Sequence, residues 1–181
     1  FDDENILTAS LSNNYFADFK PYITLNSENN EGTPSFSDDG KFMVFTSCEM
    51  DFKNNSCDIY YSQMIDNLWS RPIKFDDNVN SAFWDSQPFI YENKLYFVSN
   101  RPGGVGGRDI YYSVKNEDGS FSKALNFREV NTEHEEVSPI VNDAIFYFSS
   151  DRYNSYGGYD IYLLDNNLIF NLGSSVNSNL D

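Results

Sequence analysis

The sequence predicts an all-β fold made of repeated four-stranded units. The tripeptide that begins at Asp58 recurs at Asp109 and Asp160, a constant step of 51 residues (109 − 58 = 51 and 160 − 109 = 51). Each copy lies among short apolar segments separated by Gly, Asn, Asp, Pro and Ser, and no stretch has sustained helical periodicity. A fixed period of this size with four strand-like segments is typical of a β-propeller blade.

The first two strands of each unit have distinct signatures. Pro34, Pro88 and Pro139 are expected at the first residue of the first strand, where a missing N–H is tolerated. The second strand has consecutive apolar residues, which indicates that neighbouring blades cover both of its faces. These runs are residues 42–45, 95–98 and 145–148.

The third strand begins at each Asp-Ile-Tyr tripeptide, and the fourth is expected over Trp69 to Phe75 and Phe121 to Phe127. The chain then holds about 3.5 blades, fewer than the 4 to 8 of a closed propeller. We therefore expect the remaining blades to come from the same or another chain. The predicted division is residues 1–31 (last two strands of a preceding blade), 32–84, 85–135 and 136–173 (three blades), and 174–181 (connector to a further blade).

Two segments of the repeat also resemble a known family. Residues 100–111 and 151–162 resemble the PD40 (WD40-like) repeat of TolB-type propellers, and the likeness extends over roughly residues 5–178. The Arg-Pro-Gly-Gly form at 101–104 is similar to repeats in OmpA-like envelope proteins of gliding, type IX-secreting bacteria. The resemblance implies a non-enzymatic protein–protein interaction module, a scaffold in the periplasm or at the outer membrane whose partners are other envelope proteins.

Composition excludes some classes of partner. The net charge of −16 argues against nucleic acid, because phosphate recognition needs clustered Lys and Arg. Acidic residues concentrate in turns and favour solubility, with a basic partner or bound cations as the alternative. No apolar run approaches the ~20 residues that span a bilayer, so any targeting signal or anchor is expected outside the given sequence.

Cys48 and Cys57 bracket the loop between the second and third strands of the first full blade. We predict a disulfide between them, against the alternative of two buried free thiols. A disulfide implies an oxidising, extracytoplasmic compartment such as the periplasm or cell surface.

In the other two blades the same loop is flanked by oppositely charged residues eight positions apart. This offset predicts charge-assisted hydrogen bonds across the hairpin neck, from Arg101 to Asp109 and from Arg152 to Asp160. The first blade has Glu49 in place of the arginine.

Tyr153, Tyr156 and Tyr159 in the third hairpin are candidate partner contacts, because tyrosine combines contact area with a polar tip. Packing within the hairpin is the alternative. The glycine-rich segment 103–107 precedes a strand, so we interpret it as a flexible hairpin and not a phosphate loop. His134 is expected to be a solvated residue, since no second ligand or nucleophile accompanies it.

No cofactor and no catalytic residue is predicted. Residues 51–56 and 116–120 carry oxygen ligands, but neither segment has the spacing of a calcium loop, so calcium is a minor alternative. Two other functions stay open. The chain could be the propeller of a peptidase whose Gly-x-Ser-x-Gly turn lies elsewhere, or it could bind glycans through Trp69, Trp84 or the hairpin tyrosines, although Trp69 is expected in the core.

Overall fold

The computed structural model describes residues 4–49 and 56–179, which form only strands, turns and loops. Within these residues no helix is long and apolar enough to cross a membrane. The strands, in chain order, are β1 (Leu7–Ser12), β2 (Tyr15–Pro21), β3 (Asn30–Phe36), β4 (Phe42–Cys48), β5 (Cys57–Ile65), β6 (Leu68–Trp69), β7 (Ile73–Lys74), β8 (Asp85–Tyr91), β9 (Lys94–Ser99), β10 (Asp109–Val114), β11 (Leu125–Asn126), β12 (Glu136–Asn142), β13 (Ile145–Ser150), β14 (Asp160–Asp165) and β15 (Leu168–Asn171).

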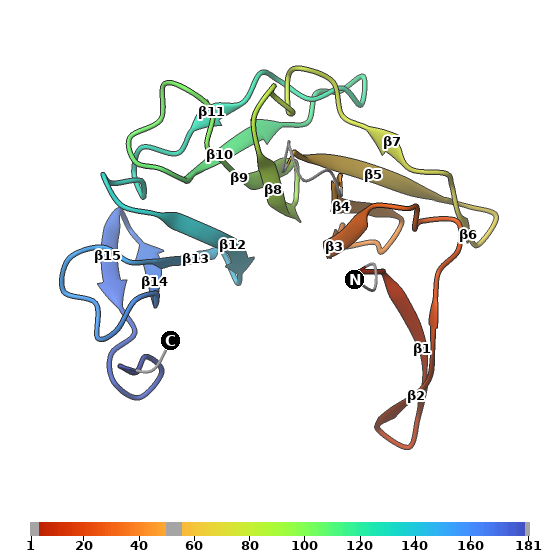
Figure 1. Ribbon diagram of the computed structural model, residues 1–181, viewed down its shortest axis with the longest axis horizontal. Helices are drawn as coiled ribbons and strands as arrows, with labels where there is room; N and C mark the ends of the chain where they lie inside the picture. The colour runs from red at the N-terminus through yellow and green to blue at the C-terminus, as the bar shows by residue number, and fades with distance from the viewer. Residues whose placement is uncertain (1–3, 50–55, 180–181) are drawn as a thin grey trace.

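The strands form antiparallel sheets that follow one another around an arc (Figure 1). The hairpin β1–β2 is followed by blade one (β3–β4–β5–β6, with β7 also paired to β5), blade two (β8 to β11) and blade three (β12 to β15). The first strands lie on the inside of the arc, where β3 contacts β8 and β8 contacts β12. The arrangement confirms the predicted propeller of four-stranded antiparallel blades.

The fourth strands are shorter than the sequence predicts. In blade one the stretch from Trp69 to Phe75 is divided into β6 and β7, with Pro72 between them. Proline cannot donate to a ladder, and the Ser62 hydroxyl donates to the Ser70 carbonyl within the interruption at 2.7 Å. In blade two a single bridge between Lys115 and Phe121 precedes the two-residue β11.

The expected place of the three prolines is wrong. Pro34, Pro88 and Pro139 lie inside their strands, at bulges where the pairing register shifts. A bulge leaves a residue unpaired, so the missing N–H disturbs no ladder bond. The residue before each proline has a positive φ: Thr33 (49°), Gln87 (52°) and Ser138 (54°).

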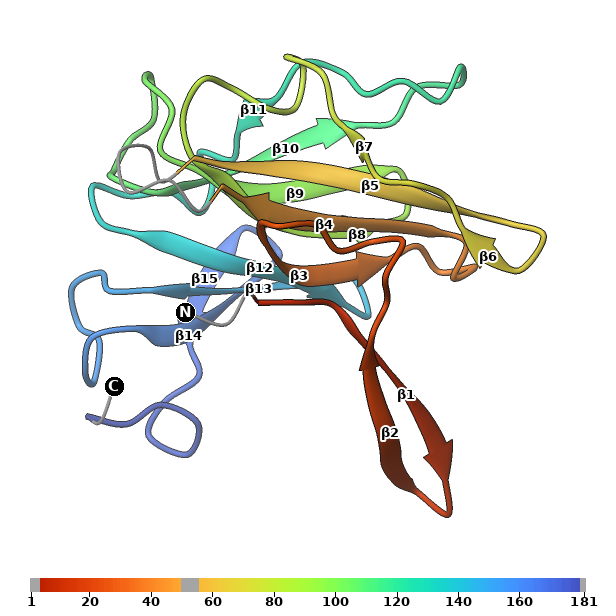
Figure 2. The same ribbon diagram turned by 45° about the vertical axis from the view of Figure 1, so that its right-hand side comes forward.

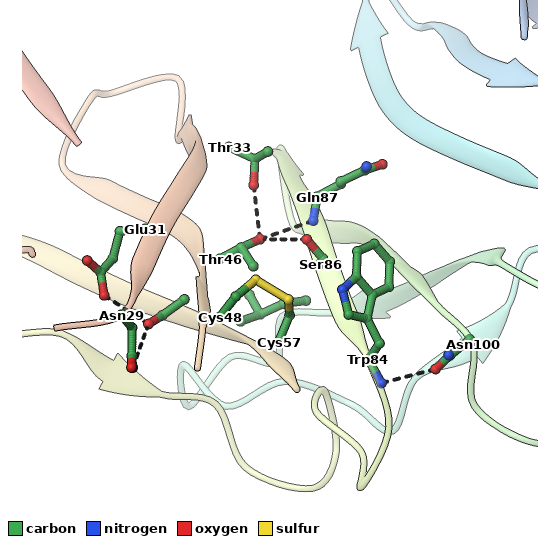
Figure 3. The surroundings of a disulfide bond; sticks show 12 residues. Asn29, Glu31, Thr33, Thr46, Cys48, Cys57, Trp84, Ser86, Gln87 and Asn100 are labelled. Atoms are coloured by element: carbon green, nitrogen blue, oxygen red, sulfur yellow. Dashed lines mark hydrogen bonds between the residues drawn. A yellow bond between two sulfur atoms is a disulfide. The ribbon is translucent and has the colours of Figure 1, made fainter. Parts of the chain in front are cut away.

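These bulges also join neighbouring blades. The Thr46 hydroxyl of β4 lies 2.9 Å from the Thr33 hydroxyl and 3.1 Å from that of Ser86, and it accepts the Gln87 amide N–H at 3.1 Å (Figure 3). The Gln87 side chain in turn accepts the Ser138 amide N–H at 2.8 Å. Polar side chains therefore link the first strands of all three blades.

The hydrophobic core lies between the sheets. One cluster joins blades one and two through residues such as Val44, Ile59 and Phe97, and another joins blades two and three. All of β4 except its last residue is buried, and so is all of β9 except its first, which confirms that neighbours cover both faces. In β13 fully buried and half-buried residues alternate, because the described chain covers only one face of blade three.

Candidate functional site: the face of hairpins and blade connectors

Two families of loops gather at one edge of the arc, on the left of Figure 2. They are the hairpins that join second to third strands and the connectors that run from a fourth strand to the next blade. Because successive strands are antiparallel, both families lie at the same end of the strands. The cysteines, the arginine and aspartate pairs and the three tyrosines predicted from the sequence all lie in these loops or at the adjoining strand ends, so this face is the candidate functional site.

A repeated asparagine fixes each connector to the third strand of the preceding blade. Asn131 accepts the Ile110 amide N–H at 2.9 Å and donates to the Ile110 carbonyl at 2.7 Å. The side chain thus completes the backbone hydrogen bonding of a strand residue, which leaves the connector little freedom. The same pair of bonds is made by Asn26 to Ile6, Asn80 to Ile59 and Asn177 to Ile161.

The predicted pairing of Arg101 with Asp109 is wrong. Arg101 donates instead to Asp85, at the start of β8, at 2.5 Å and to the Val79 carbonyl at 2.6 Å. Asp109 lies opposite Ser99 in the ladder, and its carboxylate is already occupied by N–H groups of its own hairpin. The offset of eight residues therefore predicts where Arg101 and Asp109 lie along the hairpin. It does not predict which acceptor the long arginine side chain reaches.

Blade three repeats this arrangement, so the predicted pair of Arg152 with Asp160 is also wrong. Arg152 donates to Glu136 at 3.0 Å and to the Val130 carbonyl at 2.6 Å. Asp160 accepts the Tyr156 amide N–H at 2.7 Å. The aspartate of each Asp-Ile-Tyr tripeptide pairs with the fourth strand instead: Asp58 with Lys74, Asp109 with Asn126 and Asp160 with Asn171.

The predicted disulfide between Cys48 and Cys57 is present (Figure 3). The two residues are directly opposite in the ladder of β4 and β5, where they close the neck of the blade-one hairpin. The next residue, Glu49, stands where the other blades have arginine, so blade one closes its hairpin covalently without a guanidinium. Residues 51–55 of one proposed calcium segment lie outside the described residues.

The three candidate tyrosines are exposed. The exposed fractions are 73% for Tyr153, 51% for Tyr156 and 41% for Tyr159. Tyr156 is held through its backbone, since its amide donates to Asp160, while its ring stays accessible. Tyrosine side chains are therefore presented to solvent from a hairpin whose backbone is anchored at Tyr156.

Arg108, at the end of the blade-two hairpin, connects this hairpin to Tyr159 in the hairpin of blade three. The sequence patterns did not identify Arg108 as a site residue. Its guanidinium pairs with Glu135, donates to the Tyr159 hydroxyl at 2.8 Å and lies 6.0 Å from the Trp84 ring centre. Burial is the largest influence and acts to lower the pKa of Arg108, but the hydrogen bonds and charge interactions with Glu135 and Tyr159 together outweigh it, so the pKa is raised. The step of 51 between Arg108 and Tyr159 was the available signal, because equivalent positions of adjacent blades lie side by side.

His134 is not the solvated residue that the sequence predicts. Its side chain is 23% exposed, and its ring meets that of Tyr153 edge to face with centroids 4.5 Å apart. Nδ1 lies 3.8 Å from Asp151, and the buried Nε2 has no hydrogen-bond partner among the residues that the structure describes. We call the surface formed by Trp84, Arg108, His134, Glu135, Tyr153, Tyr156 and Tyr159 the aromatic loop patch.

The glycine-rich hairpin is closely packed, in contrast to the flexible loop expected. A Cβ at Gly106 would overlap the carbonyl oxygen of His134, so only glycine lets the hairpin approach the connector this closely. Trp69 packs against the cluster of Leu25, Met43 and Phe45, as the sequence predicts. Among the described residues no group of three or more His, Cys, Asp or Glu is placed to hold a metal ion.

Comparison with known proteins identifies the fold. No protein-family model and no curated protein matches the sequence. A solved structure from Agrobacterium tumefaciens, assigned as TolB, is similar with a TM-score of 0.50 and 17% identity, over 81% of this chain and 49% of that chain. A prolyl endopeptidase structure gives a TM-score of 0.52 and 13% identity, over 84% of this chain and 20% of that one. The likeness shows a propeller fold, and the chain spans about half of the first structure and a fifth of the second.

Proposed function

We propose that the chain is a non-enzymatic protein–protein interaction module of the bacterial cell envelope, which docks other envelope proteins in an outer-membrane or periplasmic assembly. The observation that carries the proposal is the aromatic loop patch. It places exposed tyrosines beside a tryptophan and an arginine, the residue types that dominate binding energy at protein interfaces.

The frame beneath the patch favours binding by a preformed surface. The connector asparagines and the packed glycine hairpin hold the loops, so little conformational freedom remains to be lost on association. The tyrosine rings add contact area with few rotatable bonds. A partner would meet a surface that is already in its bound shape.

Two observations support an extracytoplasmic location. The Cys48–Cys57 disulfide is stable in an oxidising compartment such as the periplasm or cell surface. The fold is also similar to that of the structure assigned as TolB. The finer proposal, an assembly for type IX secretion or gliding, comes from the Arg-Pro-Gly-Gly resemblance at 101–104.

Site-specific photocrosslinking tests the proposed interface. We would replace Tyr156 by the photoreactive p-benzoyl-phenylalanine, irradiate in envelope extract and identify adducts by mass spectrometry. The matched control carries the same residue in place of Glu117, which is exposed in the turn that follows β10. We expect a discrete adduct from position 156 only. No adduct, or the same adducts from both positions, would refute the patch as an interface.

Two alternatives stay predictions with tests of their own. A peptidase requires a Gly-x-Ser-x-Gly turn in the full open reading frame that contains this segment. Glycan binding through Trp84 predicts array binding that a Trp84→Ala variant loses. Trp84 is half-buried against the core between blades two and three, which leaves only part of its ring for stacking.

A further inference from the structure

Blade two shows how this fold holds a guanidinium group. The Arg101 guanidinium carbon lies 5.1 Å from the Phe97 ring centre and 4.9 Å from that of Tyr111, two residues opposite each other in the ladder. The group also donates to the buried Asp85 carboxylate and to the Val79 carbonyl. The site thus consists of an aromatic pair, a buried carboxylate and a connector carbonyl.

Blade three builds the same site from equivalent residues. The Arg152 guanidinium carbon lies 4.9 Å from the Phe148 ring centre and 5.0 Å from that of Tyr162. It donates to Glu136 at 3.0 Å and to the Val130 carbonyl at 2.6 Å. Two occupied copies therefore define the chemistry that this position in a blade provides.

Blade one keeps every wall of the site. The rings of Phe45 and Tyr60 are opposite in the ladder and stacked, with centroids 6.1 Å apart and planes at 25°. The corresponding values are 6.1 Å and 22° in blade two, and 5.8 Å and 22° in blade three. The carboxylate is Glu31, 3% exposed, and Leu25 takes the place of the two connector valines.

The acceptors of blade one are arranged as in blade three, without the arginine. Glu31 Oε1 accepts hydrogen bonds from the hydroxyls of Ser27 at 2.6 Å and Ser47 at 2.9 Å. Glu136 Oε1 accepts the equivalent bonds from Thr132 and Ser150, and also the bond from Arg152. Within the described residues no cation pairs with Glu31, and no donor meets the Leu25 carbonyl.

None of the described residues fills the space for the missing group. Glu49 replaces the arginine and is exposed, and a cavity of about 610 Å³ lies against the walls, lined by residues that include Leu25, Glu31, Phe45, Ser47 and Tyr60. We call this cavity the blade-one socket. Asn29 lies beside Glu31 and donates to Ser47 at 3.3 Å (Figure 3). Because the disulfide already closes this hairpin, blade one does not need an arginine of its own for that purpose.

The charges around the socket favour an incoming cation. Burial raises the pKa of Tyr60; the Lys74 ammonium acts to lower it, but the carboxylates of Asp58, Glu49 and Glu31 act to raise it, so the ring stays neutral and suited to cation–π contact. Lys74 is engaged by Asp58 at 2.6 Å. Arg71 lines the mouth of the cavity but is exposed, and it forms no ion pair with Glu31 in the described structure.

We propose that the blade-one socket binds a guanidinium group, the arginine side chain of a partner polypeptide. A planar guanidinium stacks on rings while its N–H groups reach a carboxylate and a carbonyl, which a lysine ammonium does less well. That the arginine belongs to a protein partner depends on the proposed function, whereas the socket's preference for guanidinium does not.

The test is calorimetric titration of the whole chain with N-acetyl-arginine amide at physiological salt. The uncharged isostere N-acetyl-citrulline amide is the ligand control. We expect saturable binding of the arginine probe and at least about tenfold weaker binding of citrulline, since desolvated charge pairing and cation–π contact are both lost. Equal affinity for the two probes, or no binding of the arginine probe, would overturn the proposal.

Two charge-matched variants place the binding in the socket. In the Glu49→Arg variant the new side chain should fill the socket from within the chain. The unfolding temperature should rise, and the affinity for the arginine probe should fall at least about tenfold. In the control, Glu117→Arg, that affinity should change less than about twofold. If the probe binds both variants as it binds the wild type, the site is not this socket. These titrations contain no partner protein, so they test the socket separately from the proposed function. The titrations can fail while crosslinking at Tyr156 succeeds, and crosslinking can fail while the titrations succeed.

Discussion

Replacing Arg101 by alanine should destabilise blade two more than the equivalent change, Arg152→Ala, destabilises blade three. The Asp85 side chain is fully buried, and Arg101 supplies the bond to its Oδ1. Both donors from Ser81 bind the other oxygen, Oδ2. The Arg101→Ala variant therefore leaves a buried carboxylate oxygen with no donor.

The expected loss for Arg101→Ala is about 3–5 kcal/mol in the free energy of unfolding, the typical result of removing one partner of a buried ion pair. Glu136 is better supplied, because its Oε1 keeps the hydroxyls of Thr132 and Ser150 when Arg152 is removed. We therefore expect Arg152→Ala to lower the free energy of unfolding by about 1.5 kcal/mol less than Arg101→Ala does. This difference is on the order of one hydrogen bond to a charged group.

Urea unfolding followed by circular dichroism measures both values. The control is Arg108→Ala, whose ion pair with Glu135 is partly exposed and should contribute about 0–1 kcal/mol. Two results would refute the assignment of these arginines as counter-ions of buried carboxylates. One is a free energy of unfolding for Arg101→Ala within about 1 kcal/mol of the wild-type value, and the other is a larger loss of that free energy in Arg152→Ala than in Arg101→Ala.

Three further outcomes are expected. Reducing the Cys48–Cys57 disulfide, which closes a short loop with a sequence separation of 9, should lower the free energy of unfolding by about 2–3 kcal/mol, and an unchanged urea midpoint with reductant would contradict this. Asn131→Ala should leave the backbone groups of Ile110 unpaired and cost about 2–4 kcal/mol, with faster hydrogen exchange at the Ile110 amide; unchanged exchange would contradict it. Burial raises the pKa of Tyr96 from its usual 10.0 to about 12, so the folded protein holds the phenol proton more tightly; the resulting stability is complete below pH 10 and is lost as pH rises through about 12. A Tyr96→Phe variant should lack this fall in the free energy of unfolding between pH 10 and about 12, and tyrosinate absorbance of the wild type should show a tyrosine that titrates near pH 12. The same dependence of stability on pH in both proteins would refute this expectation.

Much of the architecture could be predicted from local patterns. The step of 51 residues gave the repeat, and the consecutive apolar residues of β4 and β9 indicated strands covered on both faces. The disulfide followed from two cysteines at the neck of one hairpin. Each of these features depends only on the position of a residue within its own repeat unit, and that position can be read from the sequence.

The partners of long side chains could not be predicted in the same way. The sequence places Arg101 eight residues before Asp109, but the guanidinium turns to Asp85 because the hairpin's own N–H groups already occupy Asp109. Arg108 and Tyr159, equivalent residues of adjacent blades, meet only because the blades stand side by side.

The sequence alone determined the repeat, the strands within it and the covalent link, since each follows from the order of residues along one unit. Only the tertiary structure decided which groups meet between units, where the prolines lie and that the arginine position belongs to a socket of two rings and a buried carboxylate. The physical reason is that a flexible side chain goes where unsatisfied acceptors and aromatic faces lie, and neighbouring blades supply these.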